Sequence, residues 1–124
     1  MNDILLYAGS AIVMLWGIAH IIPTAAVVRT FGNISAESKQ LITMEWIAEG
    51  IALLFIGLVV FLATVAGSPG NPVSQLICWA AAAASLAIAI LALFTGARTS
   101  MIPVKICPAV MTVAALLMVL GNLL

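Results

Sequence analysis

Charge is what this sequence has least of. Only 6% of its 124 residues are charged, whereas 65% are hydrophobic, and a typical soluble domain carries roughly 25% charged residues. A chain so poor in charge cannot cover its own core with a polar surface. The composition therefore excludes an ordinary water-soluble domain and predicts an integral membrane protein.

The few charges also cancel, because four Lys and Arg residues stand against four Asp and Glu residues. Without a basic surface there is no electrostatic field to hold a nucleic acid, and without an acidic run there is nothing to attract a basic partner. We therefore expect no nucleic-acid partner.

Cysteine and histidine are equally scarce, with two cysteines and one histidine in the chain. Cys78 and Cys107 form neither a CxxC pair nor the Cys/His spacing of a metal site. A single histidine also gives little support for a bis-histidine haem. The sequence therefore predicts no metal site and specifies no cofactor.

Long apolar runs are what the sequence does contain. Three short polar breaks separate four such runs, and a helix needs roughly 20 apolar residues to cross about 30 Å of hydrocarbon. The expected spans cover residues 4–28, 41–66, 73–95 and 101–123. We predict a single all-α domain, a four-helix transmembrane bundle that lies in the lipid bilayer as a multi-pass protein of the inner (plasma) membrane.

Local signals mark where these helices begin and end. The first span either ends at Ile22 or continues past Pro23, because proline disturbs a helix interior. Ser35 is a suitable N-cap for the second helix, with Glu37 in its first turn. Residues 67–72 are rich in glycine, proline and asparagine and predict a tight connection to the third span.

The basic residues predict the orientation of the bundle. They occur only in or beside the first and third breaks, at Arg29, Lys39, Arg98 and Lys105. Lys and Arg in short loops are retained on the cytoplasmic side. With four spans, the N and C termini and the second break then lie outside.

The third span is rich in alanine. Ala80 and Ala84, and Ser85 and Ala89, are small residues four positions apart. Small side chains let helices approach closely in lipid. The third helix is therefore predicted to be the packing hub, and the same pattern would serve a homo-oligomer.

Polar side chains gather near the cytoplasmic ends of the spans. Glu45 and Glu49 share one helix face, and Trp16 shares a face with His20. If the helices are antiparallel neighbours, these groups and Lys105 lie at a similar depth in the membrane. We predict an inward-facing ligand-binding pocket formed by Trp16, His20, Glu45, Glu49 and Lys105.

Each of these residues also has a structural explanation, which the sequence leaves open. Glu45 would sit at headgroup level, and Glu49 would pair with Lys105 or Arg98. Lys105 would extend its ammonium group to the interface. His20 would bond to a neighbouring backbone group, beside the Ala19 carbonyl that Pro23 leaves without a donor.

Two stretches are of the kind that a family signature contains, Met44-Glu-Trp-Ile-Ala-Glu-Gly50 and Gly96-Ala-Arg-Thr-Ser-Met-Ile-Pro-Val-Lys-Ile-Cys-Pro108. The four-span layout at this length resembles the DoxX-like small prokaryotic membrane proteins. Some of those proteins are associated with quinone-linked redox chemistry, so the resemblance implies a quinone-like ligand.

Three functions follow from these patterns. The leading hypothesis is binding of a small lipophilic or quinone-like molecule in the cytoplasm-facing pocket, as an enzyme or as a redox-associated subunit. The second is a proton-coupled small transporter that acts as a homodimer. The third is a structural subunit of a membrane complex. The sequence leaves open whether the protein is an enzyme.

Overall fold

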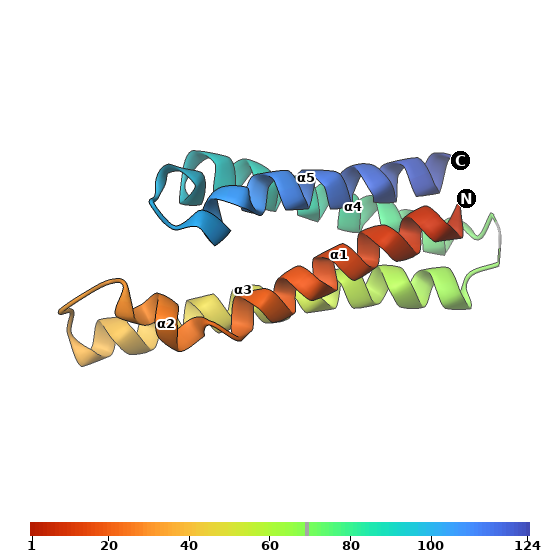
Figure 1. Ribbon diagram of the computed structural model, residues 1–124. Coiled ribbons are helices and arrows are strands. Elements are labelled where there is room, and N and C mark those ends of the chain that lie inside the picture. The colour runs from red at the N-terminus through yellow and green to blue at the C-terminus, as the bar shows by residue number, and fades with distance from the viewer. Residues whose placement is uncertain (69) are drawn as a thin grey trace.

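The computed structural model describes residues 1–68 and 70–124, and this part of the chain is helical without strands. Figure 1 shows the arrangement. The elements are α1 (Asp3–Ile21), α2 (Thr24–Arg29), α3 (Ala36–Ala66), α4 (Pro72–Phe94), the 3-10 turn η1 (Gly96–Arg98) and α5 (Ile102–Leu123). Four of them, α1, α3, α4 and α5, are long and apolar enough to cross a membrane. The predicted all-α fold with four helices long and apolar enough to span a membrane is therefore confirmed.

Short polar residues begin three of these helices. The side chain of Asn2 accepts a hydrogen bond from the backbone of Leu5, and that of Asn71 accepts one from Val73. Ser35 Oγ accepts from the backbone N–H of Ser38 at 3.1 Å, as the sequence predicts. These caps satisfy N–H groups that have no partner within the helix. Pro69, in the predicted turn at residues 67–72, lies outside the described residues.

Pro23 divides the first apolar segment into two helices. The helix α1 ends at Ile21 and α2 begins at Thr24, because proline has no N–H to continue the hydrogen-bond ladder. The hydroxyl of Thr24 donates to the carbonyl of Ile21 at 2.5 Å and so satisfies one acceptor at the break. The segment predicted at residues 4–28 is thus shared between α1 and α2.

The four long helices form an antiparallel ring. Contacts between α1 and α3 and between α4 and α5 are the most extensive, while α5 closes on α1 and α4 closes less extensively on α3. Both termini and the α3–α4 connection lie at one end, with α2 and η1 at the other, where the α1–α3 and α4–α5 pairs diverge (Figure 1). The backbone N–H of Asn2 donates to the carbonyl of Gly121 at 2.6 Å and ties the two termini together.

Glycine allows α1 and α3 to meet backbone to backbone. A Cβ atom on Gly17 would lie 2.8 Å from the carbonyl oxygen of Gly50, and one on Gly57 would lie 2.7 Å from that of Ser10. Such distances leave no room for a side chain. In α4, Ser85 and Ala89 are buried but Ala80 faces outward. The most extensive contact is therefore between α1 and α3, which corrects the prediction that the third spanning helix is the hub.

The half of the bundle nearest the termini is filled with apolar side chains. Leu6, Val13, Val60 and Met118 have no exposed surface. The hydroxyl of Ser10 donates to the Tyr7 carbonyl of its own helix. This end is closed, so any sizeable cavity must lie toward the diverging ends.

Candidate functional site

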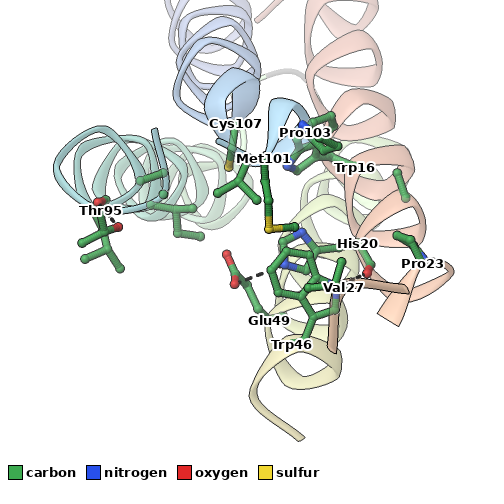
Figure 2. A pocket seen from close by; sticks show the side chains of 17 residues that line it. Trp16, His20, Pro23, Val27, Trp46, Glu49, Thr95, Met101, Pro103 and Cys107 are labelled. Carbon is green, nitrogen blue, oxygen red and sulfur yellow. Dashed lines mark hydrogen bonds and ion pairs between the residues drawn. The ribbon is translucent and has the colours of Figure 1, made fainter. Parts of the chain in front are cut away.

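A cavity of about 640 Å³ lies where the two helix pairs diverge. Figure 2 shows the side chains around it. Its wall is largely apolar and comes from all four long helices, from α2 and from the segments around η1. The lining residues are Trp16, Ala19, His20, Pro23, Val27, Trp46, Glu49, Ala52, Ile88, Leu91, Ala92, Thr95, Gly96, Met101, Pro103, Val104 and Cys107. An apolar cavity with a few convergent polar groups is typical of small-molecule sites.

His20 of α1 and Glu49 of α3 lie side by side in the wall of this cavity. His20 Nε2 lies 3.2 Å from Glu49 Oε2, and the two side chains are 10% and 45% exposed. The separation suits an ion pair when the imidazole is protonated, but the nitrogen makes no hydrogen bond of acceptable geometry. Nε2 is therefore held close to a carboxylate while it remains available to another polar group.

Trp46 fixes the position of His20. Its indole stacks on the imidazole with ring centroids 3.9 Å apart and an interplanar angle of 15°. The indole Nε1 also donates a hydrogen bond to the carbonyl oxygen of His20. That carbonyl lies at the helix end that Pro23 interrupts, where the backbone hydrogen-bond ladder stops. One side chain of α3 thus holds both the ring and the backbone of His20.

Trp16 lies one helical turn before His20, deeper in the bundle. Its indole nitrogen is buried and has no hydrogen-bond partner of acceptable geometry. The thiol of Cys107 lies beside it, but sulfur is a weak acceptor and the indole N–H can only donate. A buried donor without a partner is costly. Trp16 therefore places at the cavity wall an N–H group whose neighbouring thiol is only a weak acceptor.

The wall opposite α1 is apolar. Ile88, Leu91 and Ala92 of α4 form part of it, and the Thr95 hydroxyl is already satisfied by the carbonyl of Leu91 at 2.6 Å. Polar groups of the cavity are thus concentrated on the side formed by α1 and α3.

Met101, in the segment before α5, points into the cavity (Figure 2). Its sulfur lies 3.8 Å from the Thr30 hydroxyl in the segment after α2, a hydroxyl that also has the carbonyl oxygen of Val27 at 2.6 Å as an acceptor. This contact links the two diverging helix pairs at the wide end of the cavity.

The structure brings together three of the five predicted site residues. Trp16, His20 and Glu49 line the cavity, whereas Glu45 and Lys105 are exposed and lie outside its wall. Lys105 lies outside the wall because of helix geometry. Cys107 faces the cavity, and two residues correspond to about 200° around a helix, so Lys105 faces away from it. That any of these residues binds a ligand stays a prediction.

Sequence reasoning did not assign Trp46, Met101 or Cys107 to the site. The spacing of Trp46 from Glu49 is a signal that both lie on the same side of α3. Residues three apart are neighbours on a helix surface. Met101 carries no such signal, because its position depends on the connection between η1 and α5.

The described residues offer no obvious metal centre. Within residues 1–68 and 70–124, no group of three or more His, Cys, Asp or Glu side chains is placed to hold a metal ion. Cys78 and Cys107 are both free and buried.

The chemistry of this cavity has to be inferred from its own residues. Comparison with family models, with curated proteins and with solved structures finds no match for the chain.

Proposed function

We propose that this protein binds a small lipophilic, quinone-like molecule in the cavity around His20 and Glu49. The observation that carries the proposal is an apolar cavity of about 640 Å³ whose indole, imidazole and carboxylate groups, from Trp16, His20 and Glu49, all come from α1 and α3. This volume falls in the range of roughly 300–1,000 Å³ that is usual for small-molecule sites. A ligand with one polar edge and an otherwise apolar body matches that distribution.

The polar groups suit a ligand that exchanges protons. The imidazole of His20 and the carboxylate of Glu49 lie 3.2 Å apart, and both are side chains that can take part in proton transfer. A quinone-like ring needs a proton donor beside its oxygen atoms when a redox partner reduces it. A role as a redox-associated subunit would therefore use both His20 and Glu49.

The cavity faces the cytoplasm in this proposal. Arg29, Arg98 and Lys105 all lie in or next to the segments at the diverging end of the bundle, which also contains the cavity. The retention of basic residues on the cytoplasmic side supports placing this end inside and both termini outside the inner membrane.

Native mass spectrometry of gently extracted protein tests the proposal. We expect an additional mass of a small apolar molecule, together with an absorption spectrum that shows its ring system. Extracted protein reconstituted in nanodiscs should also bind menadione above the level of empty nanodiscs. Protein that carries no small molecule and binds no menadione would overturn the proposal.

The transporter alternative needs a polar route through the terminal half of the bundle. The buried hydroxyls there are already engaged with their own helices, Ser10 with the Tyr7 carbonyl and Thr64 with the Val60 carbonyl. Leu6 and Val13 of the same half are fully buried apolar side chains. Binding is therefore better supported than transport. Uptake into vesicles that is driven by a pH gradient and lost in Glu49→Gln would reverse this order.

A further inference from the structure

We propose that the ligand carries a carbonyl oxygen at the deep end of the cavity and that Trp16 donates a hydrogen bond to it. This inference rests on the proposed function and specifies the ligand class. The favoured class is a flat ring with carbonyl groups, in preference to a hydrocarbon or a carboxylic acid.

The donor is the first part of the argument. Trp16 Nε1 is buried without a hydrogen-bond partner, and an indole N–H cannot accept. Burying such a group unpaired costs stability that a bound acceptor would restore. The neighbouring Cys107 thiol is a weak acceptor, so a carbonyl oxygen beside the indole would make the stronger hydrogen bond.

A second nitrogen lies on the same side of the cavity. His20 Nε2 follows Trp16 by one turn on the same face of α1. Because His20 Nε2 already lies 3.2 Å from Glu49 Oε2, Trp16 is the donor that we assign to the carbonyl oxygen of the ligand.

Glu49 argues against an acidic ligand. Its carboxylate lines the cavity and is 45% exposed. Among the described residues, no Lys or Arg side chain lines the cavity, so a ligand carboxylate would meet the like charge of Glu49 without a basic Lys or Arg beside it. Neutral carbonyl groups avoid this repulsion.

The rest of the ligand would extend toward the bilayer between α3 and α4. Among the adjoining spanning helices this pair makes the least extensive contact. Ala52 of α3 and Leu91 of α4 both line the cavity and are exposed. An apolar substituent can therefore leave the cavity through this side without crossing a polar surface.

Two probes with the same ring system but different polarity test the inference. Menadione carries two carbonyl groups, and 2-methylnaphthalene carries none. Equilibrium binding of each is measured with the full chain in nanodiscs, after subtraction of binding to empty nanodiscs. The variant Trp16→Phe keeps a ring and removes the N–H. The control Trp79→Phe changes a tryptophan on α4 that lies outside the cavity wall.

We expect the wild-type protein to bind menadione about tenfold more tightly than 2-methylnaphthalene, a ratio in the range of one or two hydrogen bonds. Trp16→Phe should reduce this ratio about fivefold, because the packing loss affects both probes and the lost hydrogen bond affects only menadione. Trp79→Phe should leave the ratio unchanged.

An equal loss for both probes in Trp16→Phe would overturn the inference and leave the proposed function standing. Failure of the wild type to bind either probe would instead count against the proposed function.

If Trp16→Phe fails to fold, infrared spectroscopy of the wild-type protein tests for the hydrogen bond to the carbonyl oxygen. A hydrogen bond from the indole lowers the stretching frequency of the carbonyl that accepts it. Menadione bound to the wild-type protein should therefore show one or both carbonyl bands below their position in lipid alone. Bands at the lipid position would overturn the inference.

Discussion

The indole of Trp46 lies face to face with the imidazole of His20, with ring centroids 3.9 Å apart and ring planes 15° from parallel. The same indole donates to the carbonyl of His20. This double contact joins α3 to the end of α1 where Pro23 interrupts the helix. It places His20 Nε2 beside Glu49 at the polar side of the cavity.

Replacing Trp46 by phenylalanine removes the hydrogen bond and keeps an aromatic ring. We expect Trp46→Phe to lower the free energy of unfolding by about 1–2 kcal/mol, because the His20 carbonyl loses its side-chain donor. The midpoint of thermal unfolding in detergent measures the effect. Trp79→Phe is the matched control, since Trp79 is 42% exposed on α4. Equal midpoints for the two variants would show that the indole N–H does not stabilise this helix end.

The contact between α1 and α3 should be sensitive to a single methyl group. A Cβ atom on Gly17 would lie 2.8 Å from Gly50 O and 2.9 Å from the backbone nitrogen of Leu54. Gly17→Ala should therefore force the helices apart and cost about 1–3 kcal/mol. Thermal unfolding again measures the loss. Ala83→Leu adds a larger group on an exposed position of α4 and should leave the midpoint nearly unchanged. A stable Gly17→Ala variant would show that this crossing is looser than described.

Entry between α3 and α4 can be blocked from one position. Ala52 of α3 lines the cavity and is exposed. An indole at this position would block the proposed exit of the ligand between α3 and α4. We expect Ala52→Trp to weaken menadione binding by about tenfold or more, a loss in the range that overpacking produces. Ala48→Trp makes the same change one turn away on α3, at an exposed residue outside the cavity wall. If both variants bind menadione as the wild type does, the ligand does not occupy this side of the cavity.

Orientation in the membrane can be measured by cysteine labelling. In a background with Cys78→Ala and Cys107→Ala, single cysteines replace Asn33 and Ser68, which are both exposed and lie at opposite ends of the bundle. With intact cells and an impermeant thiol reagent, Ser68→Cys should label and Asn33→Cys should not, because basic residues flank Asn33. Labelling of Asn33→Cys alone would place the cavity on the external face and favour an extracytoplasmic ligand.

The sequence by itself determined the helices and their ends. Four apolar runs of sufficient length require helices in a bilayer, since an unpaired backbone group there is too costly. The break at Pro23 follows from its missing N–H, and the cap at Ser35 follows from its short hydroxyl side chain. These features depend on neighbouring residues alone, so they can be read without a tertiary structure.

The sequence also indicated three residues of the candidate site, because Trp16, His20 and Glu49 lie at similar depth in their spans. Depth along a helix is a local property that residue position defines. Rotation about the helix axis is not a local property, because it depends on which neighbouring helix each face contacts. Lys105 has the expected depth and the wrong rotation, whereas Glu45 shares the face of Glu49 and lies one turn nearer the start of α3, so both lie outside the cavity wall.

Only the tertiary structure decided which surfaces meet. The glycine contacts of Gly17 with Gly50 hold α1 against α3, while the limited contact between α3 and α4 leaves room for the cavity. The stack of Trp46 on His20 exists because those two helices cross at that point. A hydrophobic pattern specifies that a helix is buried in lipid or protein, but contact between particular side chains needs the crossing angles and rotations of all four helices together.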